Sequence, residues 1–318
     1  PFTPEVTSNV IEECNNRRAY VGFHVGTKET GSRLDGLREV PELVGGGRLH
    51  VAHINAYCRG SILEPSEECD EALDILEAHQ GQYVSEVHQA VPNSTSGLCD
   101  EEGRVMADVA RNCLRLRGYM PSADGVRQAI REGYASAIME SNDEVKYVRG
   151  KEALGLFEKL KTDCPLSFPV NLPSTAFRLT TAKGRDDQFI VDAIATDGGS
   201  HPRNVAIQTT MALVKLGALS PLEAVTKLSW NPSKMVGLLQ KGHFSSGADA
   251  DVTLIDPDRG IATMSLVRGQ MIMKDGQVVG TGGTLMVTPY GEQSGRNSGL
   301  PYEVVDLTKS KLYAGYKR

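Results

Sequence analysis

Four short apolar runs decide the fold of this chain: AYVGFHV at residues 19–25, LHVAHIN at 49–55, YVSEVHQAV at 83–91 and FIVDAIATDGG at 189–199. Each run is rich in β-branched or aromatic residues, which is typical of a buried strand. Each also carries a histidine or an aspartate towards its carboxyl end. We therefore predict four strands that end in polar side chains, the fourth of them over residues 189–196.

Helical patterns separate the first three runs. Residues 4–18 are amphipathic, a second helix is capped near Ser32 and ends at the glycines 45–47, and a third pattern covers 67–81. Strand and helix thus alternate at roughly 30-residue intervals. This rhythm predicts an α/β fold with a parallel sheet or a (β/α)8 barrel.

The rhythm stops after residue 91 and resumes later. The next segment carries mostly helical signals broken by prolines, and the chain after Gly247 consists of short β runs with an Asp275-Gly276 hairpin signal. We predict barrel elements at 1–91, a helical insertion at 92–187, the last barrel strand with its helices at 188–244, a small β domain at 245–290 and a polar C-terminal tail at 291–318.

Composition excludes several classes of partner. The 318 residues include 34 Lys and Arg against 40 Asp and Glu, and no basic stripe is present that would neutralise phosphates, so we expect no nucleic-acid partner. The longest apolar stretches are far shorter than the roughly 20 residues that span a bilayer, so we expect no membrane span. The six cysteines form no C-x-x-C pair, which favours reduced thiols and a cytoplasmic location.

Three metal-competent side chains lie at predicted strand ends. His24 and His53 end the first two strands, and Asp197 follows the last one. A single histidine at a strand end is more often structural, but three such residues at one edge favour a site, because barrel active sites lie at the carboxyl ends of the strands. Imidazole and carboxylate together suit zinc, which activates a bound water. Asp197 would take the proton of that water and deliver it to a leaving amine.

Other polar residues near the same edge are candidate substrate contacts. The set comprises Tyr57, Arg59, His88, Ser94 and His201. Arg59 would pair with a carboxylate, although a solvated loop arginine is an open alternative. His88 has a supporting or surface role as its alternative, and His201 a structural role at a helix start. A surface or capping role suffices for His50.

The pattern resembles the metal-dependent amidohydrolase superfamily, which includes dihydroorotases, hydantoinases and N-acyl-D-amino-acid deacylases. In that family a histidine ends barrel strand five, another ends strand six, and an aspartate ends strand eight. YVGFHVG, RLHVAHIN and AIATDGGSH place His24, His53 and Asp197 in these positions. The passage at 219–258, with its G-A-D-A-D sequence, is similar to the family's transition from the last helix to a β-sandwich. The long insertion resembles the D-aminoacylase branch.

The resemblance implies the C-terminal half of a TIM barrel with part of a small β-sandwich. The family's His-x-His pair and its bridging ligand have no counterpart here. We therefore expect a second polypeptide that carries the N-terminal barrel half, assembly into a higher oligomer, and one or two divalent metal ions, with zinc as the favoured metal.

The implied activity is hydrolysis of a C–N bond in a cyclic amide or N-acyl amino acid by metal-activated water. The alternative is a non-catalytic scaffold or regulatory subunit that keeps the fold without a complete metal site. Because residues 92–187 leave the barrel after a strand end, we expect them to cover the substrate site, with Ser94 near its mouth. An oligomer contact, within a higher oligomer, is the alternative for that segment.

Overall fold

The computed structural model describes residues 2–141, 144–198, 201–281 and 283–316. The chain forms two compact units. The first unit comprises residues 1–89, 174–195 and 205–318, and the second comprises residues 90–173 and 196–204.

A parallel four-stranded sheet forms the centre of the first unit, in the order β1-β2-β3-β8. Its strands are β1 (Gly22–His24), β2 (Leu49–Ala52), β3 (Tyr83–His88) and β8 (Ala193–Ala195). Each of the four predicted strands is present over a shorter range. One reason is that His53 and Asp197, which follow β2 and β8, have left-handed backbones with φ of 54° and 50°, and a strand cannot continue through that conformation.

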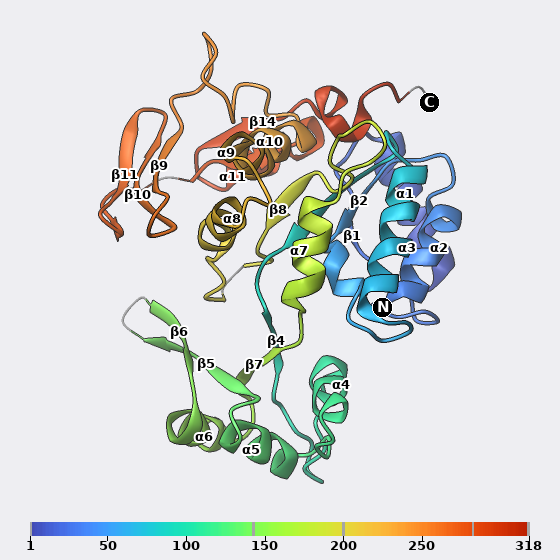
Figure 1. Cartoon of the computed structure of the whole chain (residues 1–318), viewed down its shortest axis with the longest axis vertical. Coiled ribbons are helices and arrows are strands. Elements are labelled where there is room, and N and C mark those ends of the chain that lie inside the picture. The colour runs from blue at the N-terminus through green and yellow to red at the C-terminus, as the bar shows by residue number, and fades with distance from the viewer. Residues whose placement is uncertain (1, 142–143, 199–200, 282, 317–318) are drawn as a thin grey trace. The chain divides into compact units, whose positions relative to one another are not determined.

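Helices of this unit pack around the sheet (Figure 1), and several of them share a buried apolar core with its strands. They are α1 (Pro4–Asn16), α2 (Leu34–Val44), α3 (Pro65–Ala78), α7 (Pro173–Thr181), α8 (Ala206–Lys215), α9 (Pro221–Val225) and α10 (Asn231–Met235). The start of α3 is fixed by a capping box in which Glu64 and Glu67 satisfy each other's backbone N–H groups. Leu37 and Val40 of α2 pack in the same core as Val51 of β2.

The other face of the parallel sheet carries the polar residues. His50 lies opposite Val84, and Glu86 lies opposite Ala193. Because side chains alternate along a strand, His50, Val84 and Glu86 point to the face opposite Val51. This polar face is the one that would line the interior of a closed barrel.

A separate antiparallel sheet lies in the C-terminal part of the first unit. It contains β9 (Val252–Asp256), β10 (Ile261–Val267), β11 (Gln270–Lys274) and β12 (Gln277–Val278), in the order β12-β11-β10-β9. The predicted hairpin turn is present, because Asp275 and Gly276 both have positive φ between β11 and β12. A two-stranded parallel sheet joins β13 (Leu285–Val287) to β14 (Tyr302–Val304).

The prediction that residues 291–318 form a polar tail is wrong. The segment contains α11 (Glu292–Asn297), β14 and the 3-10 turns η4 (Leu307–Lys309) and η5 (Lys311–Tyr313). Its apolar side chains join a buried cluster made of Val84, Ala193, Met235, Val305, Leu307, Leu312 and Tyr313. Four apolar residues spread through a polar segment thus cover the amino-terminal end of the polar face, next to Val84.

The prediction of a helical insertion over residues 92–187 is also wrong in part. The second unit has α4 (Asp108–Leu116), α5 (Ala123–Arg131) and α6 (Gly150–Lys159), together with a sheet of β4 (Pro92–Ser96), β5 (Ser136–Ser141), β6 (Glu144–Val148) and β7 (Pro165–Pro169). The sheet is antiparallel in the order β4-β7-β5-β6. Sequence reasoning missed these strands because they are short, and because prolines flank the buried pair Leu166 and Phe168. Most of α7 belongs to the first unit.

A buried lysine, Lys227, binds the backbone just before β8. Lys227 lies in the π-helical turn Thr226–Trp230, has no exposed surface, and donates from Nζ to the carbonyl oxygen of Val191 at 2.6 Å. Its Nζ also lies 4.0 Å from the ring centre of Phe189. Burial lowers the pKa of Lys227 to about 7, although the charge of Asp192 acts in the opposite direction.

We expect the Lys227→Met variant to have a different pH dependence of stability. The native state binds fewer protons than the unfolded chain between about pH 7 and pH 10, so wild-type stability rises with pH across that window. At about 1.4 kcal/mol per pH unit, the wild type should gain about 4 kcal/mol relative to the variant. Urea unfolding at both ends of the window measures this gain. Lys215→Met is the matched control, because Lys215 is exposed and also donates to a carbonyl, that of Asp258. Equal slopes for wild type and Lys227→Met would contradict the prediction.

Candidate functional site

Three histidines meet at the carboxyl ends of β1, β2 and β3. The ring centroids of His24 and His53 are 5.7 Å apart, and those of His53 and His88 are 5.6 Å apart. His24 is exposed, His53 is half-buried and His88 is buried. We call His24, His53 and His88 the histidine cluster. It unites two predicted metal ligands with one predicted substrate contact.

The backbone of His53 adopts a left-handed conformation, which is unfavourable for a residue with a side chain. A single oxygen of Glu86 holds it there. Glu86 Oε1 accepts from the His53 backbone N–H at 2.8 Å and lies 2.8 Å from the ring Nδ1. Strained residues of this kind concentrate at functional sites. The structure therefore singles out His53 by its conformation as well as by its position.

Glu86 is buried in the middle of β3, and a second histidine lies near it. His50 Nε2 is 3.8 Å from Glu86 Oε1, and His50 Nδ1 is 3.2 Å from the Tyr20 hydroxyl. Burial would raise the pKa of Glu86, but the hydrogen bonds and charges of His53 and His50 outweigh burial and lower it. Burial lowers the pKa of His50. The surface or capping role predicted for His50 is wrong, because the strand register places it on the polar face beside Glu86.

Tyr57 holds strand ends together, and its burial disfavours the predicted role as a substrate contact. It has no exposed surface and lies in the 3-10 turn η1 (Ile54–Tyr57). Its hydroxyl accepts from the Val25 N–H at 2.9 Å and donates to the carbonyl of Ala52. Both hydrogen-bonding directions of the hydroxyl are thus used within the fold.

Asn55 connects the turn after β2 to the end of β3. Its Nδ2 donates to the His88 carbonyl at 2.9 Å, and its Oδ1 accepts from the His88 N–H at 3.0 Å. The reciprocal pair fixes the backbone of His88 relative to the turn that follows His53. Sequence reasoning did not identify Asn55, although a buried amide directly after a strand end is a usable signal.

Asp197 forms a second polar group, within the second unit. Arg203 Nη1 donates to the Asp197 carbonyl at 2.9 Å and to Oδ2 at 2.8 Å, and Arg203 Nη2 donates to Ser94 Oγ at 3.2 Å. Arg203 is 3% exposed, whereas the Asp197 side chain is 44% exposed. The structure thus joins the predicted residues Asp197 and Ser94 through an arginine that sequence reasoning did not identify.

His201 lies in the same segment as Asp197. Its backbone N–H donates to the Gly198 carbonyl at 3.1 Å, and its own carbonyl accepts from the Arg203 N–H at 2.8 Å. Burial and the nearby Arg203 charge lower the pKa of His201, against the opposite effect of Asp197. Its role as a substrate contact stays a prediction, as does that of the half-buried Arg59.

The residues of the first unit fit a metal site in part. His24 and His53 provide adjacent imidazoles, which suit zinc. Near them, Glu86 Oε2 and His50 Nε2 are buried atoms that find no hydrogen-bond partner among the described residues. Across the part of the chain that the structure describes, no group of three or more His, Cys, Asp or Glu side chains is positioned to hold a metal ion. The described residues thus supply some donors of such a site and not a complete set.

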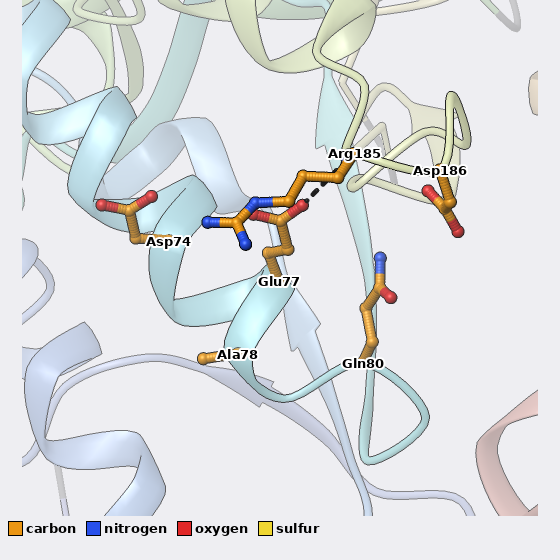
Figure 2. Close-up of a pocket in the computed structure, with 6 residues that line it drawn as sticks. All are labelled: Asp74, Glu77, Ala78, Gln80, Arg185 and Asp186. Atoms are coloured by element: carbon orange, nitrogen blue, oxygen red, sulfur yellow. Dashed lines mark hydrogen bonds between the residues drawn. The ribbon is translucent and has the colours of Figure 1, made fainter.

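A surface hollow lies at the opposite ends of the strands. It is lined by Asp74, Glu77, Ala78, Gln80, Arg185 and Asp186, on α3 and on the loops that precede β3 and β8. Figure 2 shows Glu77 beside the loop that precedes β8, where the Glu77 carboxylate accepts a hydrogen bond from the Arg185 backbone N–H at 3.3 Å. Barrel chemistry occurs at the carboxyl ends, so the hollow is not the candidate active site.

Among the described helices, none has the length and apolar character needed to cross a membrane.

Comparison with known protein families identifies part of this chain. Residues 167–281 match the amidohydrolase family. A dihydroorotase from Pelotomaculum thermopropionicum is 37% identical over 86 residues, which cover 21% of this chain and 20% of the relative. A dihydroorotase from Geobacter metallireducens is 24% identical over 293 residues, which cover 79% of this chain and 66% of the relative. The chain therefore spans less than two thirds of each relative.

Solved structures share the fold. In the formyltransferase/hydrolase complex from Methylorubrum extorquens, one chain matches with a TM-score of 0.56 and 16% identity, over 93% of this chain and 56% of that one. The N-acyl-D-glutamate deacylase from Bordetella bronchiseptica, complexed with zinc and a phosphonate inhibitor, matches with a TM-score of 0.50 and 13% identity, over 87% and 59%. These likenesses confirm the predicted α/β fold.

Proposed function

We propose that this chain, which belongs to the metal-dependent amidohydrolase superfamily, supplies one half of an active site that hydrolyses the C–N bond of a cyclic amide or an N-acyl amino acid. The observation that carries the proposal is the pair His24 and His53 at adjacent strand ends, with His53 held in a strained conformation by the buried Glu86. The matched relatives include dihydroorotases and a zinc-containing deacylase, so both amide classes are candidate substrates.

His24, His53 and Asp197 are the proposed metal ligands, with zinc as the proposed metal. Their positions in the chain support this assignment, since each ends or closely follows a strand of the four-stranded parallel sheet. When bound, a zinc ion would supply a Lewis acid that polarises the amide carbonyl and makes water more acidic. The incomplete donor set of the described residues agrees with further ligands from outside these strands.

Asp197 is the proposed proton carrier. Its carboxylate would accept a proton from the attacking water and deliver it to the leaving nitrogen. Arg203 supports this role, because two hydrogen bonds from Nη1 fix both the carbonyl and one carboxylate oxygen of Asp197. We propose Arg59, His88, Ser94 and His201 as contacts for the substrate's remaining polar groups.

A further polypeptide segment completes the proposed site. The parallel sheet has four strands among the described residues, whereas a closed barrel of this class has eight. We propose that the other four strands, with the remaining metal ligands, come from a second polypeptide or another part of the same protein. One structural neighbour is a multisubunit complex, which supports a site assembled from more than one polypeptide.

All six cysteines are free thiols, and we propose a cytoplasmic location on that ground.

Zinc content separates the enzyme from its rival, a non-catalytic scaffold or regulatory subunit. The missing His-x-His pair favours the rival if these residues act alone. We expect elemental analysis of the purified native assembly to give about one zinc per copy, since a structural or catalytic zinc binds tightly to such donors. The His24→Ala/His53→Ala variant should contain less than a tenth of that amount. A metal-free native assembly without amide hydrolysis would contradict the proposed function and support the scaffold.

A further inference from the structure

We propose that Asn55 is a positioning residue for the substrate site: its side-chain amide takes the place of a strand partner of His88 and thereby holds the His88 ring beside His53. Asn55 has no exposed surface, so its effect on a substrate would pass through His88. The catalytic purpose rests on the proposed function, in which His88 binds the substrate. The link between Asn55 and His88 is a property of the fold and is tested separately.

The pairing of β2 with β3 stops before it reaches His88. In the described part of the chain, β2 and β3 pair as far as Val51 and Ser85. On its other side, β3 pairs with β8 as far as His88 and Ala195. The chain leaves β2 because His53 turns into a left-handed conformation and a 3-10 turn follows. Since His88 is 2% exposed, its backbone N–H and C=O need partners inside the protein.

A carboxamide side chain can provide both partners at once. It carries an acceptor oxygen and an NH₂ donor, as a peptide group carries C=O and N–H. Asn55 Nδ2 donates to the His88 carbonyl at 2.9 Å, and Asn55 Oδ1 accepts from the His88 N–H at 3.0 Å. Both distances are those of good backbone hydrogen bonds. Asn55 therefore satisfies the backbone of His88 as a neighbouring strand would.

The same link connects two members of the histidine cluster. Asn55 lies two residues after His53, in the turn η1, and it binds the residue that ends β3. Glu86 already accepts from the His53 N–H in the middle of β3, and Asn55 extends this connection to the strand end. The ring centroids of His53 and His88 lie 5.6 Å apart. We infer that Asn55 maintains this spacing.

A second asparagine uses the same geometry at the opposite end of the sheet. Asn15, also without exposed surface, donates from Nδ2 to the Arg48 carbonyl at 2.9 Å and accepts at Oδ1 from the Arg48 N–H at 2.7 Å. Arg48 directly precedes β2, at the amino-terminal end of the sheet, whereas barrel chemistry occurs at the carboxyl ends. The two asparagines match in burial and in this bonding, and only Asn55 binds a residue of the histidine cluster. Asn15 is therefore the matched control.

Crystal structures of the native assembly test the positioning directly. In Asn55→Ala, the His88 backbone loses both partners, so we expect the His88 ring to leave its 5.6 Å spacing from His53. Asn15→Ala should keep that spacing. An Asn55→Ala structure with the wild-type spacing would overturn the proposal.

Hydrogen exchange in the wild-type assembly tests the link without any variant. Mass spectrometry with fragmentation to single residues would measure it. We expect the His88 amide to exchange as slowly as that of Val87, which is paired with Ile194 of β8. Fast exchange of the His88 amide would overturn the proposal even if Asn55→Ala did not fold.

Kinetics on dihydroorotate, hydantoin and N-acyl-D-amino acids separate positioning from a general loss of stability. We expect Asn55→Ala to raise KM about tenfold, the scale of one lost hydrogen bond, with kcat within about twofold of the wild type. Combining Asn55→Ala with His88→Ala should raise KM no further than His88→Ala alone, because both changes remove the same contact. Asn15→Ala should lower the melting temperature by a similar amount and leave KM unchanged.

Two kinetic results would overturn the positioning role: additive effects of Asn55→Ala and His88→Ala on log KM, or an equal rise of KM in Asn15→Ala. A wild-type assembly that hydrolyses none of these amides would contradict the proposed function instead. In that case the ring spacing and the exchange of the His88 amide still decide whether Asn55 positions His88.

Discussion

Asp197→Asn is expected to lower kcat for amide hydrolysis by about 10³-fold while leaving the fold and the melting temperature nearly unchanged. General acid–base groups contribute about 10²-fold to 10⁴-fold to rate, and the amide of asparagine cannot accept the proton of water. The fold should persist because Asn retains an acceptor oxygen for Arg203, whose Nη1 also binds the backbone carbonyl at 2.9 Å. Steady-state kinetics with dihydroorotate, hydantoin and N-acyl-D-amino acids would measure the loss on whichever substrate is hydrolysed.

A matched carboxylate separates this effect from a general change in charge. Asp186 is exposed in the loop that precedes β8, and its side chain accepts a local hydrogen bond from the Gln188 N–H at 3.1 Å. Asp186→Asn should therefore keep full activity. Activity of Asp197→Asn within tenfold of the wild type would remove Asp197 from the role of proton carrier.

The sequence predicts the strand ends well because the signals there are local. Apolar runs followed by a histidine or an aspartate indicate where β1, β2 and β8 end. In the structure, the ring centroids of His24 and His53 lie 5.7 Å apart. Pattern also predicts the Asp275-Gly276 turn, since positive φ at both positions favours Asp and Gly. In each case the decisive information lies within a few neighbouring residues.

Contacts between distant segments were not predictable in the same way. Glu86 meets His53 only because β2 and β3 are in parallel register and His53 turns into a left-handed conformation. A charged residue within the apolar run YVSEVH was a signal that Glu86 has a partner, but not which one. Likewise Arg203 reaches Ser94 across 109 positions of sequence. The C-terminal segment looks polar by composition, yet a few apolar residues anchor it to the core.

The last prediction is that residues 1–318 alone will not behave as a monomeric, cooperatively folding protein. Among the described residues, β1 and β8 form the two edges of the four-stranded parallel sheet, so each leaves one row of backbone groups without a strand partner. On α1, Val6 and Val10 are 42% and 48% exposed at the i, i+4 spacing of one helical face, and Phe2, which precedes the helix, is 66% exposed. Unpaired edges and an open apolar stripe favour self-association and a broad thermal transition.

Supplying the missing strands should reverse this behaviour. Closing a barrel from two halves buries an area in the range of obligate interfaces, about 2,000 Å² or more, so the complementary half should bind tightly and sharpen the melting transition. Light scattering, calorimetry and binding of an apolar dye, with and without that half, measure the change. Lys substitutions at Val6 and Val10 should reduce self-association of the isolated chain, whereas substitution of Leu222, which is exposed on α9, serves as the control. A monomeric isolated chain that melts cooperatively with full zinc occupancy would show instead that four strands suffice, because no edge would then need a partner.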